Sequence, residues 1–300
     1  MRVAGAPISW GVSELPGWGH RMPPDRVLAE MRQVGLEATE LGPPGYLPAD
    51  ASARGELLER HRMRLVAGFV AAVLHDPSGR PLEEIDHEAT TLAASGAEVV
   101  VVAAALGGET YDNRRGLNAS EWRRLAKTLG EAAEAAIEHG LILAFHPHAG
   151  TAVATASDVE RLLETTQVDL CLDTGHLFLG GADPAAIACD AGGRIRHVHL
   201  KDVDSTVAGR LRAGEVSYAD AVRQGLYKPL GQGDLDIDAV FTRLQEAGYQ
   251  GWFVLEQDTA LTAEPEPQSG PAAAARQSLE YFRRIASAKK TTVLPRRSER

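Results

Sequence analysis

The residues SEWRRLAKTLGEAAEAAIEHGLILAFHPH, numbers 120–148, place a helix pattern, a glycine and a strand pattern in direct succession. In the first part, apolar residues recur every three or four positions, as on the buried face of an amphipathic helix. We expect this helix over residues 120–139, with Ser120 as its N-cap and Gly140 as its stop. The apolar run 141–145 that follows is typical of a strand covered on both faces.

The same succession of helix, glycine and strand recurs along the chain. Glycine follows the helix patterns that end at Val34, Ser95 and Ala247, each time just before a strand pattern. Eight such units, of roughly 32 residues each, favour a closed (β/α)₈ TIM barrel of the α/β class over a doubly wound sheet. No GxGxxG turn follows the first strand, which argues against a dinucleotide-binding fold. The predicted strands are residues 3–10, 37–41, 64–73, 98–105, 141–148, 168–173, 197–201 and 251–256.

Three segments lie outside this repeat. Residues 203–234 are long for a connection between strand and helix, and predict a lid or an inserted helix. Residues 259–275 predict a linker to one last helix. We expect a single catalytic domain over residues 1–286 and a disordered basic tail over residues 287–300, which carries five positive charges and one negative one.

Composition narrows the function classes. A net charge of −10 argues against nucleic acid as a partner, because nucleic-acid binding relies on clustered Lys and Arg. No apolar run is long enough to span a membrane, and the first residues lack the pattern of a secretory signal. We therefore expect a cytoplasmic protein without a membrane partner. Cys171 and Cys189 are isolated and predict buried thiols rather than a disulfide.

Metal-competent side chains close four consecutive predicted strands. In barrels of this class the carboxyl ends of the strands carry the active site. One histidine after a strand is more often a hydrogen-bonded cap, but four strands in a row are harder to explain that way. Imidazole and carboxylate together favour Mn²⁺, Co²⁺, Zn²⁺ or Fe²⁺ over Mg²⁺ and Ca²⁺. The strand ends read His146-Pro147-His148, Asp173-Thr174-Gly175-His176, His197-Val198-His199-Leu200-Lys201-Asp202 and Glu256-Gln257-Asp258.

These strand ends resemble the xylose isomerase-like sugar isomerase/epimerase superfamily, and within it the inosose dehydratase branch. The resemblance covers residues 1 to about 260. Further matching segments are Ala6-Pro7-Ile8-Ser9-Trp10, Thr39-Glu40-Leu41-Gly42, Ala149-Gly150-Thr151 after the HPH segment, Pro229-Leu230-Gly231-Gln232-Gly233-Asp234, and Gly251-Trp252-Phe253-Val254-Leu255 before Glu256.

The resemblance implies one divalent ion, held in the epimerases of the superfamily by a Glu, an Asp, a His and a second Glu. Asp173, His199 and Glu256 match the last three positions, and His146 stands where the first Glu would be. Whether His146 binds the ion, or leaves that to a water or to His148, stays open. The exchange of Glu for His removes one of the two bases of an epimerase and favours dehydration.

The resemblance thus implies a metal-dependent lyase that dehydrates a keto-cyclitol such as 2-keto-myo-inositol. The ion, Mn²⁺ or Co²⁺ before Zn²⁺ or Fe²⁺, would stabilise an enolate while the β-hydroxyl leaves. Substrate contacts and proton carriers are expected among His176, Lys201, Glu40 and His148, with a lowered pKa for Lys201.

Alternatives accompany these assignments. Lys201 could form a rim ion pair with Asp202, and Glu40 could be a cap or loop carboxylate. The chain could be a ketose isomerase or epimerase, a hydroxypyruvate isomerase, or a binding barrel without catalysis. A polyhydroxylated keto compound is the expected small-molecule partner, and the sequence leaves open whether the protein is a monomer or a homo-oligomer. Trp10, Trp18 and Trp252 are candidates for an apolar wall, with core packing as the alternative for Trp252.

Overall fold

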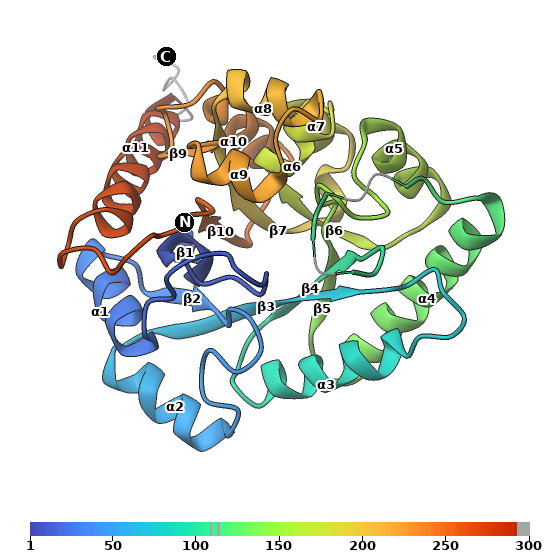
Figure 1. The fold of residues 1–300 in the computed structure, drawn as a ribbon, viewed down its shortest axis with the longest axis horizontal. Coiled ribbons are helices and arrows are strands. Elements are labelled where there is room, and N and C mark those ends of the chain that lie inside the picture. Colours follow the sequence, from blue (N-terminus) through green and yellow to red (C-terminus); the bar gives the residue numbers. More distant parts are fainter. Residues whose placement is uncertain (109, 113–114, 293–300) are drawn as a thin grey trace, which may run out of the picture.

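Eight parallel strands close into a barrel in the computed structural model of the chain, which describes residues 1–108, 110–112 and 115–292. The order around the barrel is β1-β10-β7-β6-β5-β4-β3-β2 (Figure 1). Each of these strands overlaps one of the eight predicted ones, so the (β/α)₈ prediction is confirmed. The barrel strands are β1 (Arg2–Gly5), β2 (Ala38–Glu40), β3 (Arg64–Ala72), β4 (Val99–Ala104), β5 (Ile142–Phe145), β6 (Asp169–Asp173), β7 (Ile195–Leu200) and β10 (Trp252–Leu255).

Alternation along the strands divides the core into two layers. Val99 and Val101 point into the barrel, where the surrounding side chains are mainly alanine and valine. Val100 and Val102 point outward and join the larger cluster that includes helix residues such as Leu125. Because both faces of the strand are covered, the whole run is hydrophobic, as the sequence predicts for a parallel barrel.

Helices surround the strands and cover the outer layer of the core (Figure 1). Two short 3₁₀ segments, η1 (Pro7–Trp10) and η2 (Gly192–Arg194), lie between them. The helices around the barrel are α1 (Pro24–Val34), α2 (Ala51–Arg60), α3 (Pro81–Ala93), α4 (Ala119–Glu138), α5 (Ala156–Thr165), α6 (Thr174–Leu179), α7 (Pro184–Asp190), α10 (Ile237–Glu246) and α11 (Pro271–Thr292).

The N-cap of α4 is Asn118, so the prediction of Ser120 was wrong by two residues. The Asn118 side chain accepts hydrogen bonds from the backbone N–H groups of Ser120 and Glu121. The Glu121 carboxylate in turn accepts from the Asn118 N–H at 2.9 Å, which completes a capping box. Ser120 lies inside the first turn. At the other end Gly140 adopts a φ of 75°, as expected for a residue that stops a helix.

Two strands, β1 and β5, end several residues earlier than predicted, and both end close before a proline. β1 stops at Gly5, and Pro7 begins the 3₁₀ segment η1. β5 stops at Phe145, because Pro147 has no N–H to donate to a neighbouring strand. The two histidines on either side of Pro147 therefore lie on the loop after β5 rather than on the strand itself.

The long connection after β7 forms a small subdomain at the mouth of the barrel. It contains the antiparallel pair β8 (Asp202–Val203) and β9 (Tyr227–Lys228), with α8 (Ser205–Arg212) and α9 (Tyr218–Arg223) between them. This confirms the predicted inserted helix. A hydrophobic cluster holds these helices to Trp18 of the N-terminal loop.

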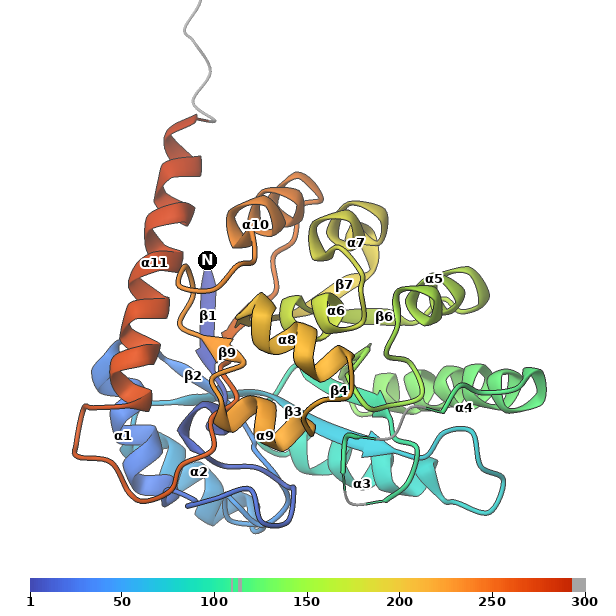
Figure 2. The ribbon, with the colours of Figure 1, turned by 45° about the horizontal axis from the view of Figure 1, so that its top comes forward.

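Helix α11 packs beside α1 and continues to Thr292 (Figure 2). The predicted linker therefore ends at Gly270, before this helix begins. The predicted boundary between residues 286 and 287 falls inside α11, and the last part of the predicted tail, residues 293–300, lies outside the described residues. Among the helices that the structure describes, none is long and apolar enough to cross a membrane.

Candidate metal centre and active site

Four predicted metal ligands converge at the carboxyl ends of β5, β6, β7 and β10. Asp173 and His199 are register partners on neighbouring strands, and Glu256 directly follows β10. The Nδ1 atom of His199 lies 2.8 Å from Oε2 of Glu256 and 3.5 Å from Oδ2 of Asp173. The Nε2 atom of His146 lies 3.6 Å from the same Asp173 oxygen. The strand ends thus bring Asp173, His199 and Glu256 together, with His146 next to Asp173.

Three of these donor atoms are buried without a hydrogen-bond partner. They are Oδ2 of Asp173, Nδ1 of His199 and Oε2 of Glu256. A buried polar atom without a hydrogen bond costs about 1–3 kcal/mol, and more when it is charged, so three around one point favour a common partner. Donor atoms of these three residues lie within 4.8 Å of one another. Two carboxylates and one imidazole around that point fit a divalent transition-metal ion.

Hydrogen bonds orient the two imidazole rings for this role. His146 donates from Nδ1 to the carbonyl of Pro147 at 2.9 Å, which leaves the lone pair on Nε2. His199 lies with Nε2 3.0 Å from Glu40, so Nδ1 is the ring nitrogen that faces Glu256 and Asp173. Burial lowers the pKa of His146 to about 3, so this ring is neutral. Burial would also lower the pKa of His199, but Cys171, Glu256 and Glu40 raise it well above its ordinary value, so a metal ion at Nδ1 would replace a proton. Both rings therefore turn one nitrogen toward Asp173.

Glu40, at the end of β2, accepts hydrogen bonds from two histidines of β7. Its Oε1 atom lies 2.7 Å from Nε2 of His197 and 3.0 Å from Nε2 of His199. Burial would raise the pKa of Glu40, but His199 and His197 outweigh it and hold the pKa far below its usual range. Glu40 is thus a buried carboxylate rather than a cap or loop carboxylate, and it orients His199. It also borders the cavity described below.

Lys201 is buried within an acidic network. Its Nζ donates to Oδ1 of Asp258 at 2.7 Å and lies 3.6 Å from Oε1 of Glu256. Burial would lower the pKa of Lys201, but Asp258 and Glu256 raise it well above its ordinary value. The carboxylates thus shift the pKa of Lys201 in the direction opposite to the lowering predicted from the charge of an ion, and Lys201 is an ammonium. Tyr218 donates to the other oxygen of Asp258 at 2.7 Å and so ties this pair to the inserted subdomain.

The predicted alternative of a rim ion pair between Lys201 and Asp202 is wrong. Asp202 points away from Lys201, and its carboxylate accepts four backbone N–H groups, from Val203, Gly231, Gly233 and Leu235. A Cβ atom on Gly233 would lie 2.3 Å from Oδ1 of Asp202, which explains the glycine there. Asp202 thus holds the loop before α10 against β8.

His148 and His176 stack on each other, with ring centroids 3.7 Å apart. His148 lines the cavity, whereas His176 lies behind it, with Nε2 3.2 Å from Nζ of Lys201. His148 donates from Nδ1 to the carbonyl of Ala149 at 2.7 Å, and burial lowers its pKa to about 3. The neutral ring therefore keeps a lone pair on Nε2. Among the predicted proton carriers, the structure places His148 and Lys201 on the cavity wall and His176 one residue layer behind.

A cavity of about 440 Å³ opens above these groups, within the size range of small-molecule sites. Predicted site residues form part of its polar wall, and Trp18 and Phe69 contribute to its apolar wall. Of the other predicted wall residues, Trp10 is buried and donates to Glu30 at 2.9 Å, and Trp252 lies in the inner core under Arg2. The predicted site residues on the wall are Glu40, His146, His148, His199, Lys201 and Glu256.

Several wall residues were not among the predicted ones. Asp258 lies two positions after Glu256, so the alternation along an extended segment was a signal for it. Tyr218 comes from the inserted subdomain, and Tyr111 donates to Glu14 across the mouth at 2.6 Å. No spacing in the sequence connects these loop residues to the strand ends.

The two cysteines differ. Cys171 is buried in the inner core on β6, as predicted, whereas Cys189 on α7 is exposed, so the prediction of a buried thiol is wrong for Cys189. Burial raises the pKa of Cys171 to about 11.

Two curated relatives match nearly the whole chain. The rhizopine catabolism protein MocC of Rhizobium meliloti is 34% identical over 298 residues, which cover 96% of this chain and 89% of the relative. An inosose dehydratase of Geobacillus kaustophilus is 33% identical over 299 residues, which cover 95% of this chain and 94% of the relative.

Solved structures match the fold at lower identity. An L-ribulose 3-epimerase superposes with a TM-score of 0.73 at 18% identity, over 100% of this chain and 99% of the other. The IOLI protein with a bound zinc atom superposes with a TM-score of 0.66 at 16% identity, over 96% and 99% of the two chains. The family model described as xylose isomerase-like TIM barrel matches residues 28–285. The chain therefore belongs to the xylose isomerase-like TIM barrel family.

Proposed function

We propose that the protein is a metal-dependent lyase that removes water from a keto-cyclitol such as 2-keto-myo-inositol. The observation that carries this proposal is the set of unpartnered buried atoms on Asp173, His199 and Glu256, next to the Lys201 ammonium and open to a cavity of about 440 Å³. The relative named inosose dehydratase, 33% identical over 95% of this chain, supports an enzyme and this substrate class.

The ion would be held by Asp173, His199 and Glu256, with His146 as the fourth ligand. This donor set fits Mn²⁺ or Co²⁺, with Zn²⁺ and Fe²⁺ as alternatives. The ion, when bound, supplies a Lewis acid that polarises the ketone of the substrate and makes the neighbouring C–H more acidic. Glu40 holds the His199 ring in the required tautomer through its hydrogen bond to Nε2.

The chain's own groups would move the two protons of the reaction. We assign the base to His148, which lines the cavity with a neutral ring and a free Nε2. It would take the proton from the carbon next to the ketone. Lys201 is the proton donor, because it is the ammonium on the cavity wall beside Glu256. Its proton would leave with the β-hydroxyl as water.

The bonds that break and form in this reaction define its products. One C–H bond and one C–O bond break, a C=C bond forms, and the resulting enol tautomerises to a 1,2-dione. Asp258 and Tyr218 keep Lys201 in place through the reaction, since Asp258 accepts from both at 2.7 Å. No oxidant or reductant is required.

Epimerisation of a ketose is the competing reaction. It needs a second base to return the proton on the opposite face of the substrate. His146 occupies the position of that base, but its Nδ1 donates to Pro147 and its Nε2 faces Asp173. These contacts favour dehydration over epimerisation.

The test is to incubate the purified, Mn²⁺-loaded protein with 2-keto-myo-inositol and to follow the ultraviolet absorbance of the dione. We expect turnover that is lost on chelation and in Glu256→Gln. Exchange of the α-hydrogen with deuterated solvent without loss of water would instead select an isomerase or epimerase. A metal-loaded protein that converts none of a panel of keto-cyclitols would support a binding barrel and overturn the proposal.

A further inference from the structure

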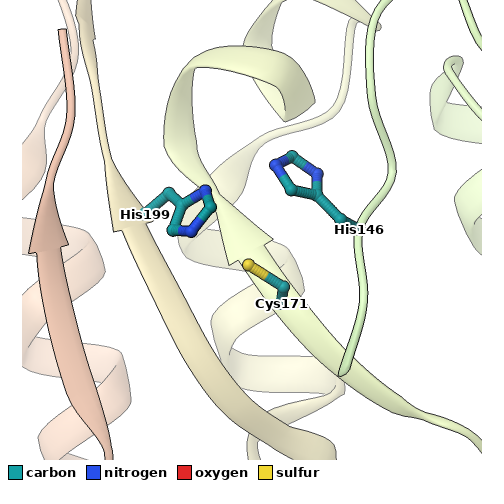
Figure 3. A group of neighbouring side chains, drawn as sticks. All are labelled: His146, Cys171 and His199. Atoms are coloured by element: carbon teal, nitrogen blue, oxygen red, sulfur yellow. The ribbon is translucent and has the colours of Figure 1, made fainter. Parts of the chain in front are cut away.

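A thiol lies directly beneath the candidate metal centre. Cys171 precedes Asp173 by two residues on β6, so both side chains point into the barrel and Cys171 lies one layer deeper. Figure 3 shows that the side chains of His146, Cys171 and His199 point toward one another from neighbouring segments. Donor atoms of these three residues all lie within 4.8 Å of one another.

Strand register puts His146 at the level of this thiol. Phe145 pairs with Leu170 in the parallel ladder between β5 and β6. The next residue on each side is His146 and Cys171. His146 therefore lies lower in the barrel than Asp173 and His199, which pair with each other one step further toward the mouth.

One ring nitrogen of each histidine is available next to the thiol. Nδ1 of His199 forms no hydrogen bond, although it lies 2.8 Å from Oε2 of Glu256, and Nε2 of His146 is open because Nδ1 is the atom that donates to Pro147. Below Cys171 the inner core consists of apolar side chains such as Ala144, Val101 and Val254. The Asp173 carboxylate lies on the mouth side, 3.5 Å from Nδ1 of His199 and 3.6 Å from Nε2 of His146.

We propose that His146, Cys171 and His199 form an inner metal position that binds a thiophilic ion such as Zn²⁺ or Cd²⁺. A sulfur and two imidazole nitrogens are the donors that such ions prefer, whereas Mn²⁺ prefers the carboxylates of the outer position. In a tetrahedral zinc site with Zn–S of about 2.3 Å and Zn–N of about 2.0 Å, donor atoms lie roughly 3.5 Å apart. Small rotations of the three side chains reach that spacing.

Binding at the inner position has a defined chemistry. The sulfur–metal bond forms as the thiol proton leaves to solvent, and the ion keeps its oxidation state. Because His146 and His199 belong to both positions, the inner and outer positions exclude each other. This inference rests on the proposed function only in that the outer position is the catalytic one. A thiophilic ion would then inhibit by drawing both rings down toward Cys171.

X-ray absorption on the wild-type protein with one equivalent of Zn²⁺ tests this directly. We expect one sulfur scatterer at about 2.3 Å from zinc. A shell made only of nitrogen and oxygen would overturn the inner position. This measurement requires no variant and no enzymatic turnover.

Titration with Cd²⁺ gives a second readout, the ultraviolet charge-transfer band of a thiolate–metal bond. We expect the band in the wild type and in the matched control Cys189→Ser, whose thiol is exposed on α7. In Cys171→Ser the band should vanish, and the Cd²⁺ affinity should fall by more than the roughly 10- to 100-fold that loss of a ligand-orienting residue costs. A band that persists in Cys171→Ser, or that vanishes in Cys189→Ser, refutes the inference. Circular dichroism would confirm that each variant is folded.

The two proposals fail separately. Mn²⁺-dependent dehydration without a Zn–S signal would leave the proposed function standing and remove the inner position. A Zn–S signal without turnover on any keto-cyclitol would support the inner position and overturn the proposed function.

Discussion

The Glu40 carboxylate lies 3.0 Å from Nε2 of His199, although β1 and β10 separate their two strands in the barrel. The same oxygen also accepts from His197 at 2.7 Å. A carboxylate behind a metal-ligating histidine fixes the tautomer of the ring and raises its basicity. Glu40 would thus act on the proposed ion through His199.

Replacing Glu40 with Gln should weaken metal binding by roughly 10- to 100-fold, as is typical when a residue that orients a ligand is lost. Isothermal titration calorimetry with Mn²⁺ measures the dissociation constant of the ion in each variant. Glu37→Gln, an exposed residue on the same segment, is the control and should leave the affinity unchanged. Equal affinities in wild type and Glu40→Gln would show that the hydrogen bond to His199 is only structural.

Addition of Mn²⁺ should stabilise the protein, because the ion would bind three buried atoms that form no hydrogen bond in its absence. At a free ion concentration of about 100 times Kd the gain in the free energy of unfolding is about 2.7 kcal/mol. Thermal unfolding with and without Mn²⁺ measures the shift in Tm. In Asp173→Asn the shift should disappear, and a shift of unchanged size there would place the ion elsewhere.

Lys201→Met should lower kcat by roughly 100- to 10,000-fold, the usual effect of removing a general acid. KM should change little, since the ion and the cavity wall remain. Steady-state kinetics with 2-keto-myo-inositol separates the two constants. Lys228→Met is the control, because Lys228 lies 3.4 Å from Asp204 in the inserted subdomain and does not line the cavity. A Lys201→Met enzyme with a wild-type kcat would assign proton donation to another group.

Asp202→Ala should destabilise the fold by about 4 kcal/mol or more, because four backbone N–H groups lose a buried acceptor and each loss costs about 1–3 kcal/mol. Urea unfolding monitored by circular dichroism gives the value. Asp190→Ala at the end of α7, an exposed position, should change the free energy of unfolding by less than about 0.5 kcal/mol. Similar values for the two variants would contradict this role for Asp202.

The fold could be read from the sequence because each repeat carries its own local signals. The glycine after α4 and the valines of β4 depend only on neighbours close in the chain, so their periodicity is sufficient. The set of candidate ligands could also be predicted from the sequence, because parallel strands all present their carboxyl ends at one rim of the barrel. Asp173, His199 and Glu256 do meet there, although their roles as ligands remain predictions.

The pKa values and the exposure of the site residues could not be predicted from the sequence in the same way. The pKa of Lys201 depends on Asp258 and Glu256, which lie more than 50 residues away in the sequence. Whether His176 reaches the cavity depends on His148 stacking in front of it. Such contacts form only when separate segments of the chain pack together. The spacing of residues within one segment therefore cannot predict them.

The subdomain built from β8, α8, α9 and β9 brings Tyr218 to the cavity wall, while the ion-binding groups come from the barrel strands. The same tyrosine donates to Asp258, so residues 203–234 act on both the cavity wall and the Lys201–Asp258 pair. Exchange of this segment between homologues would therefore have to retain Tyr218 for Lys201 to stay in place. Within that limit, the insertion is the natural target for directed evolution of the cavity.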